Sequence, residues 1–451
     1  MELDHVRRLA VCAVLSMTSA LAAAQSSGSA GLEEIVVTAR KRAESIQDVP
    51  VSVTAVNQAA IERNFIARIE DLQQITPNVT LEPVSITSSA LAPYIRGIGN
   101  RAQEPVQDPA IAISVDGVYL ATIVGSALDV FDVEQIEILR GPQGTLQGRN
   151  SPGGAINMRT RRPGDELHMR AEASYGNYDT YSIKAAIDGP IVPELLGAKL
   201  AVMTSQSDGY VEDLTTGEDL SGQDTIAARV GFLLTLNDSV DLYLTADYLK
   251  DESPQRGLRN TASSIAGLPG QPDVLLCNPA VLAPLGACVT DRKYKTTMDF
   301  TAGNDLEVWS VAANLNWSFG SGIELTSVTG YRDADELQRV DVDGTFLPLL
   351  HSIDRRMKVD QFSQEIRLGS SRSGSFSAGQ LDWVVGVYYV DSSWELSQPI
   401  DAFGSVIPAH REQDLKSYAG FGQATYHISD RWSASIGGRQ TKDEKDLDVT
   451  F

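Results

Sequence analysis

The feature that most restricts the fold of this 451-residue chain is a regular alternation of apolar and polar side chains along its second part. Between Val308 and Phe319 every second residue is apolar, and mostly polar residues stand between them. Successive side chains of a β-strand point to opposite faces, so this pattern predicts a strand with one apolar and one polar face. We find 11 such segments, at residues 167–175, 180–188, 199–206, 225–236, 240–250, 308–319, 323–332, 358–368, 381–390, 416–428 and 432–439.

Most of these segments are longer than the five or six residues usual in a soluble β-sandwich. About nine to eleven residues are needed for a tilted strand to cross a bilayer. Short connections such as 237–239 are mixed with long ones at 251–305 and 396–414, and outer-membrane barrels have the same contrast between periplasmic turns and external loops. The pattern therefore predicts a transmembrane antiparallel β-barrel, although a soluble sandwich uses the same alternation.

The first 24 residues are predicted to be a secretory signal peptide. Arg7 and Arg8 precede a short apolar run, and Ala22-Ala23-Ala24 provides a cleavage site. Export implies an oxidising compartment. Cys277 and Cys288 both fall in the longest connection, where we expect a disulfide bond, since no His-rich spacing supports a zinc site.

Residues 133–163 read VEQIEILRGPQGTLQGRNSPGGAINMRTRRP, which is a short strand followed by a stretch rich in glycine. These glycines could simply mark turns, and neither a Walker loop nor a G-x-G-x-x-G motif is present. The stretch resembles the end of the plug domain of TonB-dependent outer-membrane receptors, with Gln147 where an aromatic residue is common. The motifs I-R-G-x-G at 95–99 and V-D-G-V-Y at 115–119 resemble the same domain. This resemblance implies a plug inside a barrel.

Residues 45–163 are predicted to form this small α+β plug domain. Strands are expected at 47–54 and at two glycine-flanked segments further on, 95–99 and 111–119. Ile61, Phe65, Ile69 and Leu72 recur at helical spacing between positions 57 and 73 and predict one helix that packs these side chains into a core.

A Ser- and Gly-rich stretch at 25–32 leads into a strand-like segment. The segment consists of Glu34, Ile35, Val36, Val37, Thr38 and Ala39. It could be an ordinary first strand of a domain. Its sequence also resembles the TonB box of the same receptors, which binds the periplasmic energy-transducing protein TonB by adding a strand to its sheet. Residues 25–44 are therefore expected to be a flexible tether that carries a TonB box.

The resemblance also implies a lock between plug and barrel. Arg96 and Arg140 match plug arginines that meet carboxylates of the barrel wall, and Glu365 is the expected partner. Glu365 shares strand parity with Ser363 and Arg367, so its side chain is expected to point into the lumen. The alternative is that each arginine only satisfies local carbonyl groups.

The charge of the chain is strongly negative and unevenly distributed. The formal net charge is −22, and residues 164–451 hold 42 acidic against 23 basic side chains. Nucleic acid is therefore not an expected partner. The acidic surface either attracts cations and metal chelates or solvates the exterior. No HExxH or G-x-S-x-G motif is present, so we do not expect an enzyme.

Taken together, the resemblance implies an outer-membrane receptor of a Gram-negative bacterium that imports a scarce solute, by default a ferric siderophore. Vitamin or oligosaccharide uptake, a passive porin and a secreted β-sandwich adhesin remain alternatives. The expected partners are TonB, outer-membrane lipid and an iron chelate, and no resident cofactor or metal is expected.

The expected domains are a signal peptide (1–24), a tether (25–44), a plug (45–163) and the N-terminal half of a barrel (164–451). Barrels of this family close with about 22 strands. The 11 predicted strands would leave two edges unpaired in lipid, where each unsatisfied backbone group is costly. The chain is therefore expected to be a fragment or a truncated product.

Overall fold

The computed structural model describes residues 35–450, except 85–89, 101–105, 127–131, 259–263, 266–273, 276–292, 321, 347–349, 371–378, 403 and 430. The predicted signal peptide, Glu34, and Cys277 with Cys288 lie outside the described residues, so the signal peptide and the disulfide bond stay predictions. Within the described residues, no helix is both long and apolar enough to cross a membrane.

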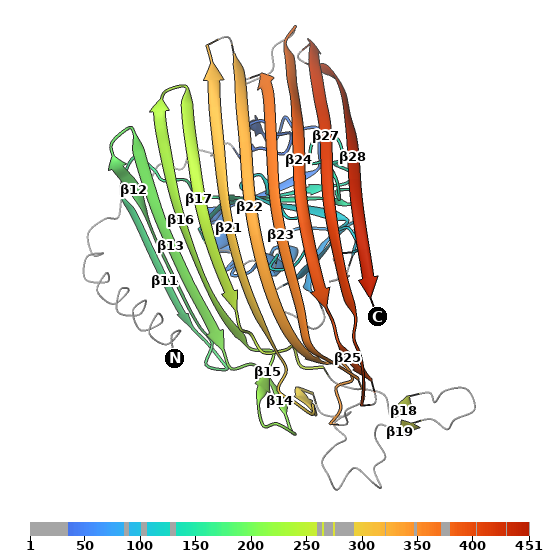
Figure 1. The fold of residues 1–451 in the computed structure, drawn as a ribbon. Coiled ribbons are helices and arrows are strands. Elements are labelled where there is room, and N and C mark those ends of the chain that lie inside the picture. Colours follow the sequence, from blue (N-terminus) through green and yellow to red (C-terminus); the bar gives the residue numbers. More distant parts are fainter. Residues whose placement is uncertain are drawn as a thin grey trace.

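A large curved antiparallel sheet dominates the molecule (Figure 1). Each of its main strands pairs with the next one along the chain. The strands in order are β11 (His168–Tyr175), β12 (Tyr181–Val192), β13 (Leu196–Ser207), β16 (Gln223–Asn237), β17 (Val240–Asp251), β21 (Gly303–Phe319), β22 (Ile323–Asp341), β23 (Leu350–Ser370), β24 (Leu381–Ser397), β27 (His410–Ser429) and β28 (Trp432–Thr450). Every segment predicted from the alternation falls on one of these strands, so that prediction is confirmed.

Several strands extend well beyond their predicted ends. Strand β22 was predicted to end at Arg332, but it continues to Asp341. Over this extension the outward-facing side chains include Asp333, Asp335 and Arg339, whereas the inward-facing ones stay buried. The apolar half of the alternation is lost because the outer face no longer meets lipid, although the backbone pairing continues.

The two ends of the large sheet differ. At one end, which we call the turn end, short connections at 193–195, 238–239 and 320–322 join successive strands. The opposite end, called the loop end, carries long connections and small strands (Figure 1). These strands are β14 (Val211–Asp213), β15 (Asp219–Leu220), β18 (Ser264–Ile265), β19 (Val274–Leu275), β20 (Lys295–Thr296), β25 (Ile400–Ala402) and β26 (Ser405–Ile407). By the rule for outer-membrane barrels, the turn end faces the periplasm.

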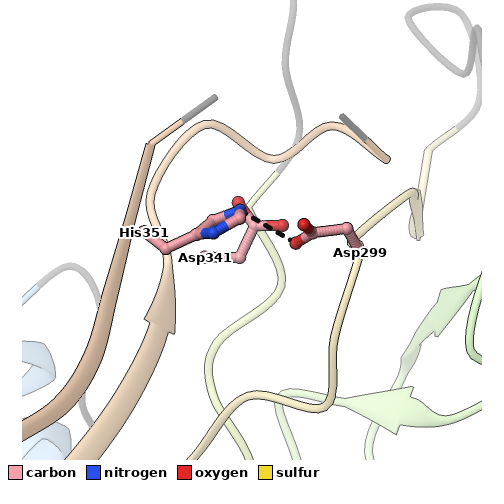
Figure 2. Close-up of side chains that lie close together, drawn as sticks. All are labelled: Asp299, Asp341 and His351. Carbon is pink, nitrogen blue, oxygen red and sulfur yellow. Dashed lines mark ion pairs between the residues drawn. The ribbon is translucent and has the colours of Figure 1, made fainter. Parts of the chain in front are cut away.

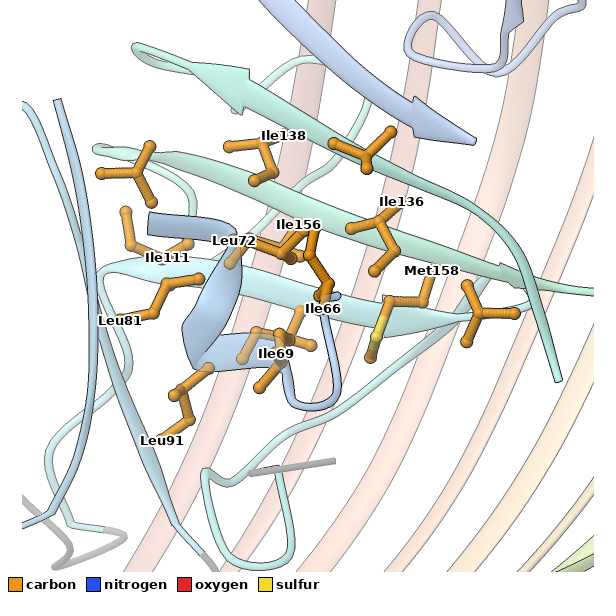
Figure 3. Close-up of a cluster of buried hydrophobic side chains, with 14 of the residues drawn as sticks. Ile66, Ile69, Leu72, Leu81, Leu91, Ile111, Ile136, Ile138, Ile156 and Met158 are labelled. Atoms are coloured by element: carbon orange, nitrogen blue, oxygen red, sulfur yellow. The ribbon is translucent and has the colours of Figure 1, made fainter. Parts of the chain in front are cut away.

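A second, smaller set of elements lies against one face of the large sheet (Figure 1). Its five-stranded sheet has the order β3 (Val53–Asn57), β9 (Val133–Arg140), β10 (Gly154–Thr160), β7 (Ile111–Val115), β8 (Val118–Tyr119). A three-stranded sheet of β4 (Val79–Pro83), β5 (Leu91–Ile95) and β6 (Ile98–Gly99) lies beside it. Apolar side chains of these elements, including Ile69, Leu72, Ile136 and Ile156, form a closed core (Figure 3).

The helix predicted between positions 57 and 73 is wrong as a single element. It is divided into α2 (Gln58–Arg63) and the 3₁₀ helix η1 (Ile69–Gln74). Phe65 adopts φ 52° and is 91% exposed, so it does not belong to the core. The amide of Ile66 donates to the carbonyl of Ile61 and the amide of Phe65 to that of Glu62, which is a Schellman ending of the helix. The apolar period continues across this break because both helices face the same core.

Candidate functional site

Residues 35–45 fold into a short hairpin at the turn end, which we call the N-terminal hairpin. Strand β1 (Val36–Val37) pairs antiparallel with β2 (Glu44–Ser45). Between them the amide of Lys41 donates to the Thr38 carbonyl over 2.9 Å, and Lys41 adopts φ 61° to close the turn. The segment predicted to be a TonB box is therefore paired with its own chain.

The plug holds this hairpin by side-chain contacts to its backbone. The Thr38 amide donates to Glu137 Oε1 over 2.7 Å, and the Thr38 hydroxyl donates to the same oxygen over 3.1 Å. Gln135 Nε2 donates to the Val36 carbonyl over 2.9 Å. Burial raises the pKa of Glu137, and the hydrogen bonds from Thr38 oppose that shift. Val37 is fully buried in the same contact, whereas Val36 is 40% exposed.

Gln147 adds a further contact of this kind. Its Nε2 donates to the Ala39 carbonyl over 3.1 Å. The position is one where the sequence departs from the plug pattern it resembles, and the amide side chain here binds the hairpin directly. Main-chain atoms of three successive parts of the hairpin, at Val36, Thr38 and Ala39, are thus bound by the plug.

A buried ion pair joins the hairpin to the barrel wall. Lys41 Nζ lies 3.1 Å from Glu365 Oε2, and Arg367 lies 2.7 Å from the other oxygen of the same carboxylate. Burial lowers the pKa of Lys41, and the charge of Glu365 opposes that shift. The Glu365 side chain is buried on the inner face of β23, while Phe362 and Ile366 are exposed on the outer face, which agrees with the predicted parity.

Arg40 and Arg42, on either side of Lys41, also contact the wall. Arg40 donates to the Thr425 hydroxyl over 2.7 Å. Arg42 donates to the Ser370 hydroxyl over 3.0 Å and lies 3.5 Å from Asp382. All three wall residues lie close to the turn end of β23, β24 and β27. Three successive basic side chains therefore attach the hairpin to three strands of the wall.

The predicted partners of Glu365 are wrong in the described part of the structure. Arg140 donates instead to the hydroxyls of Ser52 and Thr54 within the plug, and Arg96 is exposed. The contacts of Arg140 are therefore local, as the alternative expectation had it, but its partners are hydroxyl groups and not carbonyl groups. Strand parity correctly predicted that Glu365 points inward, but the cation that meets it is Lys41 of the N-terminal hairpin. No sequence pattern pointed to Lys41, because the hairpin brings it to the wall from a segment expected to be a flexible tether.

Other contacts between plug and wall were not predicted. Lys199 Nζ lies 2.7 Å from Asp132, and Arg229 lies 3.8 Å from the same carboxylate. Gln361 accepts from the Ala121 amide over 2.8 Å, and Arg332 donates to the Val124 carbonyl over 2.7 Å. The charged residues Lys199 and Arg229 within predicted strands were a usable signal. A charged side chain in a membrane strand is far less costly when it points to the lumen than when it points to lipid, so both could have been predicted to face the plug.

The fold and these contacts define a plug held against the wall of an outer-membrane β-barrel. Residues 45–155 match the TonB-dependent Receptor Plug Domain family, and residues 282–450 match the family of TonB dependent receptor-like β-barrels. The chain therefore belongs to the TonB-dependent receptor family of outer-membrane proteins.

Known relatives agree with this assignment. The chain is 30% identical over 207 residues to the pesticin receptor of Yersinia pestis, covering 45% of this chain and 30% of that protein. It is 23% identical over 410 residues to the ferrioxamine B receptor of Salmonella typhimurium, covering 87% of this chain and 55% of that protein.

Solved structures show the same fold. The ferric yersiniabactin uptake receptor of Yersinia pestis superimposes with a TM-score of 0.71 at 18% identity, over 88% of this chain and 61% of that one. The ferripyoverdine receptor of Pseudomonas aeruginosa superimposes with a TM-score of 0.69 at 16% identity, over 92% of this chain and 55% of that one. The chain thus spans between about half and three fifths of the length of these solved receptors.

Proposed function

We propose that this protein takes part in the TonB-driven import of a ferric siderophore, or another scarce iron complex, across the outer membrane. The observation that carries this proposal is the N-terminal hairpin at the turn end, where a strand-forming segment lies within reach of the periplasm. In this proposal residues 25–44 are the tether, residues 45–163 the plug, and residues from 164 onward the barrel wall.

Active import across the outer membrane needs a source of work. The outer membrane has no ATP and no ion gradient of its own, so energy must arrive through a mechanical link to the inner membrane. A strand that docks on TonB by main-chain hydrogen bonds is such a link. In the structure, the side chains of Gln135, Glu137 and Gln147 form hydrogen bonds with main-chain atoms of this segment. Release of the hairpin would free those groups for TonB.

The basic residues of the hairpin explain how pulling could reach the plug. Lys41 is paired with Glu365 of the wall, and the strand before it is bound to the plug strand β9 through Gln135 and Glu137. A force on the tether would therefore act first on these contacts of the hairpin with the wall and with β9, and only then on the rest of the plug. A passive porin needs neither the plug nor this hairpin.

The cargo is proposed from relatives, since their names refer to pesticin, ferric pyoverdine and ferrioxamine B. Another relative is a vitamin B12 transporter of Vibrio vulnificus, 26% identical over 196 residues. An iron chelate is the ligand named for the pyoverdine and ferrioxamine receptors and for the ferric yersiniabactin uptake receptor. Vitamin uptake is an outcome that the experiment below can detect.

The experiment measures uptake of radiolabelled ferric siderophores and of vitamin B12 by cells that lack this protein, with the gene supplied in trans. Each strain is tested with and without TonB. We expect uptake of at least one ferric siderophore that needs both this protein and TonB. Uptake that persists without TonB would support a porin instead, and uptake confined to vitamin B12 would overturn the proposed cargo.

A further inference from the structure

A cluster of two carboxylates and one imidazole lies close together (Figure 2). It is at the loop end, opposite to the end where the N-terminal hairpin lies. Asp299 precedes β21, Asp341 ends β22 and His351 is near the start of β23. We propose that these three residues, called the loop-end triad, bind one divalent transition-metal ion, with zinc as the simplest representative.

The distances suit a single ion. One ligand atom from each residue lies within 4.8 Å of the other two, and His351 Nε2 lies 3.0 Å from Asp299 Oδ1. Zinc binds nitrogen and oxygen at about 2.0–2.2 Å, which separates two ligands of a tetrahedral ion by about 3.4 Å. The widest pair would have to close by no more than about 1.4 Å, the difference between 4.8 Å and about 3.4 Å, to complete the site.

The second observation is that Asp341 Oδ2 has no hydrogen-bond partner among the described residues. The other two ligand atoms, Asp299 Oδ1 and His351 Nε2, form an ion pair with each other. Asp341 is fully buried and His351 is 3% exposed, so these atoms have little access to water. Leaving a buried polar group unpaired costs about 1–3 kcal/mol, and more for a charged one. A metal ion would satisfy all three atoms at once.

Charge supports the same conclusion. The carboxylate of Asp343 also lies beside the triad, with its Oδ2 4.0 Å from His351 Nε2. Three carboxylates thus gather around a single imidazole. An ion with two positive charges would balance two carboxylates, and the neutral imidazole would supply the third bond.

The residues around the triad hold its side chains in place. The Gly344 amide donates to Asp341 Oδ1 over 2.8 Å, which leaves Oδ2 for the ion. Gln255 exchanges two hydrogen bonds with the backbone of Asp341. The His351 ring packs edge-on against Phe300, with 5.0 Å between ring centroids. Such orienting partners are typical of built metal sites.

The ligand chemistry selects the class of ion. Imidazole favours zinc and its neighbours in the transition series over magnesium and calcium, which prefer oxygen alone. A chelated ferric ion is enclosed by its own ligands and could not receive three buried side-chain atoms. The loop-end triad is therefore separate from the cargo, and its ion would join the loop before β21 to the β22–β23 connection.

The test uses the purified protein in detergent after treatment with a chelator. Titration with zinc, followed by calorimetry, should give one tight site per chain, and cobalt should give visible absorption bands typical of a nitrogen-ligated tetrahedral ion. His351→Gln and Asp341→Asn should each weaken zinc binding at least about 100-fold, because even loss of an orienting partner costs about 10–100-fold.

His410→Gln is the matched control. His410 is also at the loop end, 3.9 Å from Glu395 and 4.0 Å from Glu412, but its side chain is 42% exposed, whereas that of His351 is buried. This variant should bind zinc within about 2-fold of the parent, since exposed charge pairs contribute little. Failure of the parent to bind one zinc ion, or binding by the triad variants equal to that of the parent, would overturn the proposal. These outcomes are independent of uptake.

Discussion

Gly154 shows at the scale of one residue why the glycine-rich stretch cannot vary freely. It adopts φ 150°, and an added Cβ would lie 2.2 Å from the Leu139 carbonyl oxygen and 2.9 Å from a methyl group of Ile95. Gly144, in the same stretch, has open space at this position. The sequence identified the stretch as important, but only the pairing of β9 with β10 distinguishes one glycine from another.

Gly154→Ala should therefore destabilise the plug by about 3 kcal/mol, because backbone atoms of β9 must move to admit the methyl group. Gly144→Ala should change stability by no more than about 0.5 kcal/mol. Denaturant unfolding of the purified protein, followed by tryptic susceptibility of the plug, measures both. Equal effects of the two substitutions would contradict this reading of the stretch.

At Phe65, in contrast to Gly154, a substitution is expected to stabilise the protein. Its left-handed backbone is one that glycine adopts without cost and other residues at about 1–2 kcal/mol. Phe65→Gly should stabilise the end of α2 by about 1 kcal/mol, while Phe65→Ala should give no such gain. The midpoint of denaturant unfolding is the measurement. The helical spacing predicted a core position for Phe65, because spacing alone cannot show at which residue a helix ends.

At the scale of the element, the N-terminal hairpin depends most on the carboxylate of Glu365. This carboxylate balances two cations, Lys41 and Arg367. Removing one partner of a buried pair leaves an uncompensated charge and costs about 3–5 kcal/mol. Glu365→Gln should therefore loosen the hairpin more than Lys41→Met, which leaves Glu365 still paired with Arg367.

Hydrogen exchange at the amides of Val37 and Glu44 reports this difference. Both amides should lose protection in Glu365→Gln and keep more of it in Lys41→Met. Arg356→Gln is the control, since Arg356 is on the same strand but pairs with Asp335 at an exposed position. A protection pattern that is unchanged in Glu365→Gln would show that the ion pair does not hold the hairpin.

The strands themselves were the most predictable elements. Alternation located all of the main strands of the large sheet, because lipid on one face and a polar interior on the other fix side-chain polarity at every second residue. The same rule failed at strand ends such as 333–341, where both faces carry polar groups. The loop-end triad also escaped sequence analysis, since Asp299, Asp341 and His351 are far apart along the chain and share no motif.

For the whole molecule, the plug motifs and the alternation together predicted the architecture of a plug against a barrel wall. What the sequence could not predict is how the two parts touch. The contacts of Lys41 with Glu365 and of Asp132 with Lys199 join segments far apart in the chain. Strand parity can place Glu365 on the inner face, but it does not identify the residue that meets it. Such pairs depend on the exact placement of one sheet inside the other.

The central claim is that the N-terminal hairpin transmits energy from TonB, and proline at position 36 tests it. Val36 is partly exposed, whereas proline at the fully buried Val37 would also disturb the resting plug. Val36→Pro removes one main-chain donor from the strand and restricts Ile35. Val36→Ala keeps that donor and is the control.

Both variants are compared for outer-membrane abundance, binding of a radiolabelled ferric siderophore at the cell surface, and its uptake by the same cells. We predict that Val36→Pro matches Val36→Ala in abundance and binding, while its uptake falls to the level of cells without TonB. Uptake by Val36→Pro equal to that of Val36→Ala would contradict the account.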